Sequence, residues 1–506
     1  MLCTILSGTT FGLDGVMIKV EVDVADRGFP TFIIVGLPSK AIDESKERVR
    51  TAIKNSSFQM PETRIIVNLA PADIPKEGSL FDLPIALGIL ASSNLLIKDE
   101  LFDSLFVGEL SLEGKIRSVP GILSIILMAK KQGIKKVYVP AENVSEAALI
   151  KDIEIYGVAD LVSLILHLNK EVILEETSPI SFSTLRQESH FENDFADING
   201  QAQAKRALEI AASGFHNISL KGPPGGGKTL LARSFPSILP EMDDEEVIEV
   251  SRIYSVSQGL KTSRIMASRP FRAPHHTTSR VGLIGGGTKL TPGEISLAHR
   301  GVLFLDEFPE FPRSVLEAMR QPMEDGYVTI SRAVGSVIFP SRFLLLAASN
   351  PCACGYLGHP KKACKCSIGQ ILKYKKRVSG PILDRIDLHI DVPPVEHDKL
   401  TQIQKAEDSL TIRSRVEVAR KIQMKRFNGT LIKMNGEMTS QHIKEFCKLD
   451  PSALALLKTA VSKLSMSARS YFKIIKVSQT IADLANEETI RDSCVSEALQ
   501  YRVNDE

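Results

Sequence analysis

Gly222-Pro223-Pro224-Gly225-Gly226-Gly227-Lys228-Thr229 decides the fold, because it matches the pattern of a phosphate-binding loop. Residues 217–220 before it are compatible with a strand, and residues 230–233 after it favour a helix. Backbone N–H groups in such a loop bind phosphate oxygens, and the helix N-terminus favours negative charge. We expect Lys228 to bind the β- and γ-phosphates of a nucleotide and Thr229 to bind Mg²⁺. The alternative is a glycine-rich turn without a ligand.

Two further apolar runs end in polar residues. Residues 302–305 precede Asp306 and Glu307. We expect Asp306 to hold Mg²⁺ through water, and Glu307 to orient and deprotonate the attacking water. Residues 342–349 precede Asn350, whose amide would position water against the γ-phosphate. The alternative for Asn350 is a turn that begins before a proline.

Two arginines are candidates for charge stabilisation in catalysis. Arg385 stands between carboxylates in residues 380–387. A neighbouring subunit could deliver it to the γ-phosphate as an arginine finger; the alternative is an internal Arg–Asp pair. Arg469 begins a predicted helix and could sense nucleotide from the side of a helical lid. The alternative for Arg469 is an ordinary surface position.

Length and composition set the class of protein. A chain of 506 residues predicts about three domains. The net charge is only +2, so any nucleic-acid surface must be local. The sequence has no apolar run of about 18 residues and no evident signal peptide, so we expect no membrane span. Seven cysteines, four of them clustered, are not typical of a secreted disulfide framework, which favours the cytoplasm.

Pattern changes along the chain predict its organisation. Residues 1–168 alternate short strands and helices, and residues 169–190 have the composition of a linker. Residues 191–394 contain the nucleotide motifs. Residues 395–506 carry helical periodicities, notably over 402–426, 451–463 and 470–485, and predict a helical lid.

Several longer strings strengthen these motifs. They are DINGQ at 197–201, FRAPHHTTS at 271–279, SNPCACG at 349–355, GPILDRID at 380–387 and SAR at 467–469. With the phosphate loop and the polar residues above, they resemble the ComM/YifB family of Mg-chelatase-like AAA+ ATPases. The resemblance implies an α/β multidomain fold. It would comprise an N-terminal Lon-protease-like (ribosomal S5 domain 2-like) α+β domain, a central AAA+ P-loop α/β domain and a C-terminal helical lid.

The resemblance also implies a function. Family members of this kind are expected to form homo-hexamers that use ATP and Mg²⁺, with Ile198 and Gly200 contributing to the nucleotide site. DNA, single-stranded and branched, would stimulate hydrolysis and undergo branch migration, in a helicase activity that integrates strands during natural transformation.

The N-terminal block lacks the dyad of a Lon protease. Its PKEG string at 75–78 precedes Ser79, but the helix expected to carry the dyad lysine is apolar from 122 to 128. The first lysine there is Lys130. A nucleophile needs a base within hydrogen-bond reach, so we predict a non-proteolytic scaffold.

Four cysteines form a possible metal site. Cys352, Cys354, Cys364 and Cys366 supply four thiolates, which suit tetrahedral Zn²⁺. One residue between paired cysteines is a tight spacing, so free buried thiols or disulfides stay open as alternatives.

Local basic density marks candidate DNA contacts. Residues 351–383 contain seven Lys and Arg and no acid, and residues 261–300 contain seven against only Glu294. Such density attracts phosphates. We predict phosphate contacts by Lys289, in a loop of the second segment, and by Arg332, beside the tip of a predicted hairpin at 327–338. The alternative is a solvated charged face.

Three functions compete at this stage. A DNA motor predicts DNA-stimulated hydrolysis. A chelatase-type remodeller predicts a dedicated protein partner and no response to DNA. A Lon-like protease predicts a reactive serine, and the missing dyad disfavours it.

Overall fold

The structure is a computed structural model of the chain, and it divides into two compact units. It describes residues 2–36, 40–74, 76, 78–187, 191–257, 265–287, 290–332, 335–394 and 406–502. Unit 1 comprises residues 1–188, 244–267 and 331–338, and unit 2 comprises the remainder. The units are therefore discontinuous in sequence, whereas the predicted boundaries were linear.

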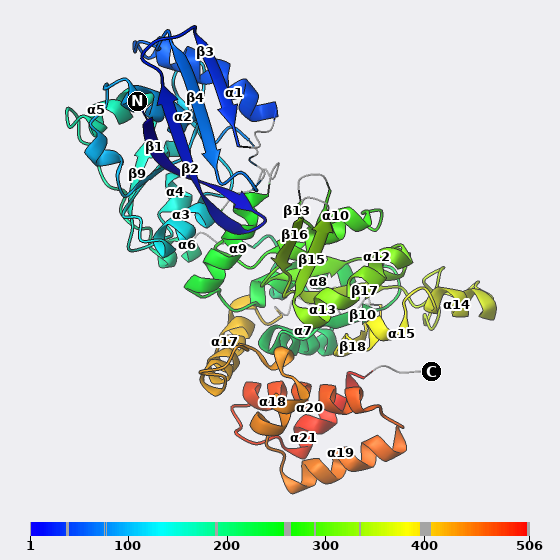
Figure 1. Cartoon of the computed structure of the whole chain (residues 1–506). Coiled ribbons are helices and arrows are strands. Elements are labelled where there is room, and N and C mark those ends of the chain that lie inside the picture. The colour runs from blue at the N-terminus through cyan, green and yellow to red at the C-terminus, as the bar shows by residue number, and fades with distance from the viewer. Residues whose placement is uncertain are drawn as a thin grey trace. The chain divides into compact units, whose positions relative to one another are not determined.

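A seven-stranded sheet forms the centre of unit 1, in the order β3-β4-β2-β1-β5-β8-β9 (Figure 1). Its β1–β2 and β2–β4 pairs are antiparallel and its other pairs are parallel. The strands are β1 (Leu2–Phe11), β2 (Asp14–Val24), β3 (Thr31–Val35), β4 (Arg64–Ala70), β5 (Ser104–Phe106), β8 (Lys136–Pro140) and β9 (Glu154–Val158), with a small separate pair of β6 (Glu109–Leu110) and β7 (Ile116–Arg117).

The helices of unit 1 bury apolar side chains against this sheet. Every residue of α2 is buried, as expected for a helix that is apolar on all sides. The α-helices are α1 (Lys40–Asn55), α2 (Asp82–Ser92), α3 (Ile122–Lys131), α4 (Val144–Ala147), α5 (Leu161–Leu168), α6 (Phe182–Gln187) and α9 (Asp244–Val256). The short 3₁₀ helices are η1 (Lys98–Leu101) and η2 (Ala141–Asn143). The predicted linker thus includes helix α6.

Unit 2 contains a parallel five-stranded sheet in the order β11-β14-β17-β10-β18. Its strands are β10 (Ile218–Lys221), β11 (Phe271–Arg272), β14 (Val302–Leu305), β17 (Leu344–Ser349) and β18 (Leu388–Asp391). The central strands β14 and β17 are apolar and buried, as is typical of a parallel sheet covered on both faces. All five strands end at the same edge, so the residues that follow them lie together.

Helices surround this sheet and continue into the C-terminal region. Those of the core are α7 (Ala202–Gly214), α8 (Lys228–Ser234), α10 (Arg280–Ile284), α11 (Glu294–Leu297), α12 (Arg313–Ala318), α13 (Arg320–Asp325), α14 (Ile368–Lys375) and α15 (Gly380–Leu383), with η3 (Phe195–Asp197), η4 (Phe235–Ile238) and η5 (Phe308–Glu310). Two short strands, β12 (Gly285–Gly286) and β13 (Thr291–Pro292), pair beside α10.

The C-terminal region is helical, as the periodicity predicted. It contains α17 (Ser409–Arg426), η6 (Asn435–Glu437), α18 (Ser440–Phe446), α19 (Pro451–Lys463), α20 (Ala468–Leu484) and α21 (Asp492–Gln500). Its apolar side chains share one core with α7 and the sheet, which includes Leu220, Leu346, Val416 and Ile481. The predicted multidomain α/β fold with a parallel sheet and helical C-terminal region is therefore confirmed.

The predicted hairpin is present as β15 (Tyr327–Arg332) and β16 (Gly335–Pro340). Residues 331–338 of this hairpin belong to unit 1. There Val337 packs so closely on Gly12 that a Cβ on Gly12 would lie 2.2 Å from the Val337 side chain. The side chain of Arg332 and the residue Lys289 lie outside the described part of the chain, so their predicted DNA contacts remain predictions.

Candidate functional site

The phosphate loop follows β10 at the edge where the parallel strands end. Gly222 N donates to Ser349 O at 3.1 Å, which joins the start of the loop to the end of β17. A Cβ at Gly222 would lie 2.1 Å from Val392 O, so this position requires glycine. Gly227 has a φ of +86°, a left-handed conformation that glycine adopts without strain, and it leads directly into α8. The loop therefore has the strand–turn–helix context that its sequence predicted.

Lys228 is buried inside this loop. Its ammonium donates to Gly222 O at 2.7 Å, to Pro223 O at 2.9 Å and to Asn350 Oδ1 at 3.2 Å. Burial lowers the pKa of Lys228, although nearby Asp306 acts in the opposite direction. The contact with Asn350 brings together two residues that the sequence predicts, from separate motifs, to act at the γ-phosphate.

A hydroxyl and a carboxylate meet beside the loop. Thr229 Oγ1 donates to Asp306 Oδ2 at 3.0 Å, so α8 and the end of β14 bring their oxygens together. Oxygen ligands of this kind suit Mg²⁺, which is commonly bound by one or two carboxylates together with substrate phosphates. The arrangement fits the predicted magnesium site.

Glu307 follows Asp306 and has an unusual backbone. Its φ of +49° is uncommon for a residue other than glycine, and its N–H donates to Asp306 Oδ1 at 2.9 Å. Its side chain is exposed, and one oxygen lies 3.5 Å from His276 Nδ1. His276 belongs to the string 271–279, but only the structure shows this contact.

Gln201, the residue just before α7, supports the phosphate loop. Its side chain donates to Gly226 O at 3.1 Å and to Pro393 O at 2.7 Å. Ile198, predicted at the nucleotide site, is buried just before it, and Gly200 has a φ of +71°. The string 197–201 contained Gln201, but only the structure shows what its amide contacts.

Arg385 and Arg469 lie at the opposite end of β10. Asn217, which precedes β10, donates from Nδ2 to Arg385 O at 2.9 Å. The four residues of β10 span about 13 Å between this point and the phosphate loop. Arg469 is in the first turn of α20 and lines the same pocket of about 620 Å³ as Arg385. Neither arginine is thus beside the phosphate loop of this chain.

One carboxylate holds both arginines. Glu324 of α13 lies 2.5 Å from Arg385 Nη2 and 3.2 Å from Arg469 Nη2. These two partners lower the pKa of Glu324, with the hydrogen bond from Arg385 as the largest cause. The internal partner of Arg385 is therefore Glu324 rather than a neighbouring aspartate. Nothing in the local sequence pairs Glu324 with either arginine, because each comes from a different element.

The four clustered cysteines converge. The ligand atoms of Cys352, Cys354, Cys364 and Cys366 all lie within 4.8 Å of one another. The Sγ···Sγ distances among Cys352, Cys354 and Cys364 run from 3.4 to 3.7 Å, close to the spacing of about 3.8 Å that tetrahedral Zn–S bonds of about 2.3 Å give. Backbone N–H groups of Tyr356 and Lys365 lower the pKa of Cys354 to about 6, whereas hydrogen bonds among the thiols raise the pKa of Cys364 and Cys366, so without a metal the thiolate form is favoured at Cys354. The donor set fits zinc.

The cysteine loop also packs against the phosphate loop. A Cβ at Gly355, which has a φ of +82°, would lie 2.7 Å from Pro224. The close approach of these two loops means that the shape of the cysteine loop affects the loop that holds Lys228.

In unit 1, the serine and the lysines considered for a protease dyad contact different partners. Lys130 binds Lys151 O at 2.8 Å and Asp152 Oδ2 at 3.0 Å, and Ser79 donates to Glu109. The buried ammonium of Lys76 donates to Pro71 O. Ser79 has no hydrogen bond to a lysine among the residues that the structure describes, and the non-proteolytic role of this domain stays a prediction.

None of the helices in the described segments has the length and apolar character needed to cross a bilayer.

Sequence comparisons cover almost the whole chain. Residues 194–400 match the family described as magnesium chelatase, subunit ChlI; residues 20–143 match subunit ChlI of Mg-chelatase; and residues 406–502 match the C-terminal part of that subunit. Competence protein ComM of Haemophilus influenzae is 44% identical over 99% of this chain and 97% of its own. Uncharacterized protein YifB of Escherichia coli is 40% identical over 98% and 96%. The magnesium-chelatase 67 kDa subunit of Heliobacterium mobile is 26% identical over 58% and 48%.

Proposed function

The chain belongs to the ComM/YifB family of Mg-chelatase-like AAA+ proteins, and on this basis we propose that it is an ATP-driven ring motor that acts on DNA. In this proposal it is a helicase-type ATPase that promotes branch migration, and it uses ATP and Mg²⁺. The competence function named for the Haemophilus relative supports a role in natural transformation.

The ring is inferred from the separation between the phosphate-site residues and the two arginines, which lie at opposite edges of the parallel sheet. Lys228, Thr229 and Asp306 would hold the phosphates and Mg²⁺ at one edge of the sheet, whereas Arg385 and Arg469 lie together at the other. An arginine finger has to reach the γ-phosphate. The arginines of one subunit would therefore serve the nucleotide of the next subunit, and head-to-tail contacts of this kind close into rings. A homo-hexamer is the ring that the family resemblance implies.

The chemistry assigned to each group follows from its position. Glu307 would orient and deprotonate the attacking water, and Asn350 would align it from the end of β17. Bound Mg²⁺ would neutralise charge on the phosphate oxygens. The arginines from the neighbouring subunit would stabilise the charge that develops during transfer.

Zinc is the second metal in the proposal. Cys352, Cys354, Cys364 and Cys366 would bind it at a closed structural site, since four thiolates leave no open position for catalysis. Its role would be to fix the loop between Asn350 and α14.

Turnover with DNA tests the function. ATP hydrolysis should rise with single-stranded DNA and with four-way junctions, and this rise should shrink as salt is added. Branch migration should convert the junctions to duplexes only when ATP is hydrolysed. Lys228→Ala should abolish both activities. Hydrolysis that is indifferent to every DNA, together with no strand movement, would reject the DNA motor. That outcome would favour the alternative, a chelatase-type remodeller of a protein complex, which the Heliobacterium relative supports.

A further inference from the structure

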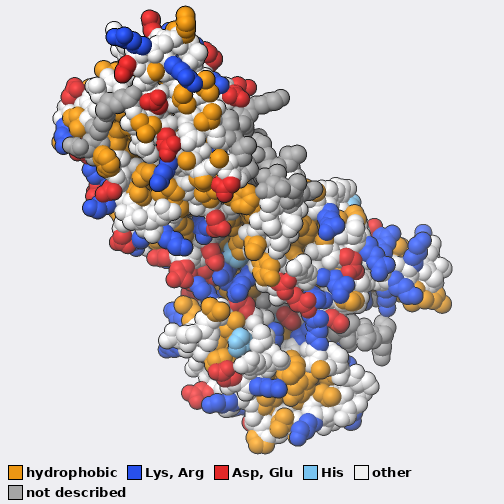
Figure 2. All heavy atoms as spheres, in the orientation of Figure 1, with side chains coloured by type: hydrophobic (Ala, Val, Ile, Leu, Met, Phe, Trp, Pro, Cys, Tyr) orange, Lys and Arg blue, Asp and Glu red, His pale blue; other side chains and the backbone are white. Residues whose placement is uncertain are grey.

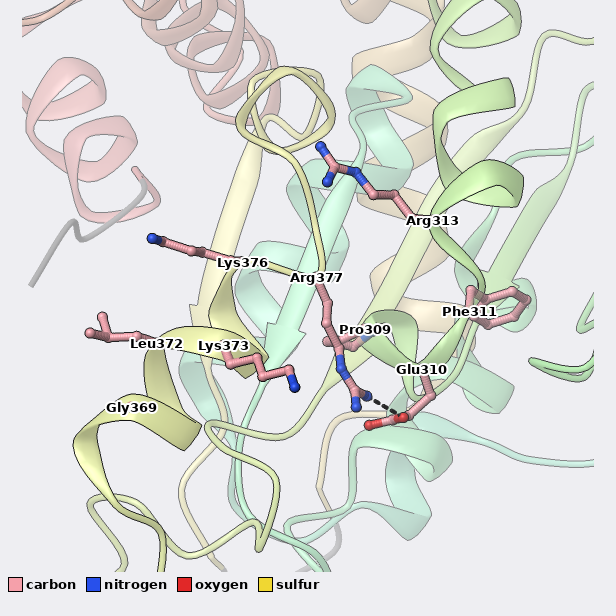
Figure 3. Close-up of a pocket in the computed structure, with 9 residues that line it drawn as sticks. All are labelled: Pro309, Glu310, Phe311, Arg313, Gly369, Leu372, Lys373, Lys376 and Arg377. Atoms are coloured by element: carbon pink, nitrogen blue, oxygen red, sulfur yellow. Dashed lines mark hydrogen bonds and ion pairs between the residues drawn. The ribbon is translucent and has the colours of Figure 1, made fainter.

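A basic groove of unit 2 lies beside η5, the turn that directly follows Asp306 and Glu307 (Figure 3). It has a volume of about 780 Å³, with η5 and the start of α12 on one side and α14 on the other. Its charged lining residues are four cations, Arg313, Lys373, Lys376 and Arg377, against the single acid Glu310. In Figure 2, Lys and Arg side chains gather over the segment that Figure 1 labels α14.

Three of these cations have no close ion-pair partner. Arg313, Lys373 and Lys376 are exposed, and in the described parts of the chain none of them forms an ion pair, although Arg313 acts on Glu317 of the same helix and lowers its pKa. Lys373 points from α14 toward the Arg377–Glu310 pair, whereas Lys376 points outward (Figure 3). Gly369 leaves open space at the same helix, since a Cβ there would meet nothing within 4 Å. Unpaired cations around open space suit the phosphates of a nucleic-acid strand.

The groove is connected to the ATP site by two contacts. Arg377 forms an ion pair with Glu310, whose N–H donates to Glu307 O at 2.7 Å. On the other side of α14, the buried side chain of Tyr374 lies near the backbone of Asn350, which lowers the pKa of its hydroxyl while burial, the larger effect, raises it. A ligand that moves α14 or separates Arg377 from Glu310 therefore acts on segments that adjoin both residues assigned to the attacking water.

We propose that this groove binds the phosphates of single-stranded DNA and thereby releases Glu310 from Arg377, which switches Glu307 into its active position. The inference rests on the proposed DNA motor and deepens it. A phosphate competes with the Glu310 carboxylate for the same guanidinium, since both are anions that pair with Arg. Glu310 lies in η5, which begins at Phe308 directly after Glu307. Release of Glu310 therefore allows the turn after Glu307 to change conformation.

Removal of the free groove cations tests binding. The double variant Arg313→Gln, Lys373→Gln should need on the order of tenfold more single-stranded DNA for half-maximal stimulation. The slope of its log affinity against log salt should become shallower by about 1.4, because each lost phosphate contact accounts for about 0.7. The matched control is Lys458→Gln, Lys463→Gln, which removes two exposed lysines from α19 and should behave as wild type.

Glu310→Gln tests the switch. Its ATP hydrolysis without DNA should rise several-fold toward the DNA-stimulated rate, whereas a residue needed only for stability would lower the rate. An unchanged DNA-free rate would overturn the switch. The binding site would be overturned if a groove variant responds to DNA as the α19 control does. It would also be overturned if the groove variant fails to assemble while the control forms rings.

The outcome also separates the two proposals. If wild-type protein ignores DNA, the proposed function fails and this inference fails with it. If wild-type protein and the α19 control respond to DNA and the groove variants respond equally, only the inference fails.

Discussion

Arg385 Nη2 lies 2.5 Å from Glu324 Oε2, and the side chain of Arg385 is only 8% exposed. This buried arginine thus has one carboxylate partner at the rim of an open pocket, at the end of the sheet that is farthest from its own phosphate loop. Its Nε has no hydrogen-bond partner among the described residues. The guanidinium is held in place by Glu324 and by Pro381 O, which accepts from Nη1 at 2.6 Å.

Arg385→Ala should abolish hydrolysis in uniform rings, because loss of an arginine finger costs about 10³- to 10⁵-fold in turnover. ATP binding measured by fluorescent nucleotide should persist. Mixing this variant with Glu307→Gln subunits should restore activity, since about a quarter of randomly mixed interfaces would pair an intact Glu307 with an intact Arg385. Two inactive variants that stay inactive after mixing would show that Arg385 does not act across the interface.

Glu324→Gln should weaken the hold on both arginines while it leaves their charges in place. We expect a higher KM for ATP and a smaller change in kcat, because misplaced arginines bind the γ-phosphate less well. Asp325→Asn, the neighbouring acid that lines the same pocket, is the matched control. Equal kinetics in the two variants would show that Glu324 does not position the arginines.

The sequence predicted those parts of the site that are encoded by contiguous residues. An apolar strand followed by a polar residue predicted the positions of Asp306 and Asn350, because parallel strands end at one edge. Helix α19 matches its predicted range of 451–463, since Asp450 caps its start by accepting from Ala453 N at 2.7 Å and Pro451 suits the first turn.

Contacts between distant segments could not be predicted in the same way. Glu324 binds two arginines from other elements, and no periodicity or spacing relates them. The grouping of residues 244–267 and 331–338 with unit 1 also depends on tertiary packing, for example Val337 against Gly12. A sequence read along its length gives linear boundaries, so it misses segments that leave one unit and pack in another.

His276→Ala should lower turnover about tenfold without weakening ATP binding, because His276 Nδ1 lies 3.5 Å from Glu307 Oε2 and would help to orient that carboxylate. His275→Ala is the matched control, since His275 Nδ1 instead contacts Thr277 Oγ1 at 2.9 Å. Single-turnover kinetics should separate the hydrolysis step from binding. Equal loss in both variants would point to a general disturbance of the loop rather than to orientation of Glu307.

Metal content tests the cysteine cluster. Purified protein should carry about one zinc ion per chain, since four thiolates complete one tetrahedral site. The double variant Cys354→Ser, Cys364→Ser should lose the zinc. It should also lower turnover, because Gly355 packs against Pro224 and an unpinned cysteine loop would disturb the phosphate loop. Cys447→Ala, which removes a buried thiol 3.8 Å from Met438 Sδ, should keep its zinc. Metal-free wild-type protein with full turnover and an unchanged melting temperature would show that the four thiols act without zinc.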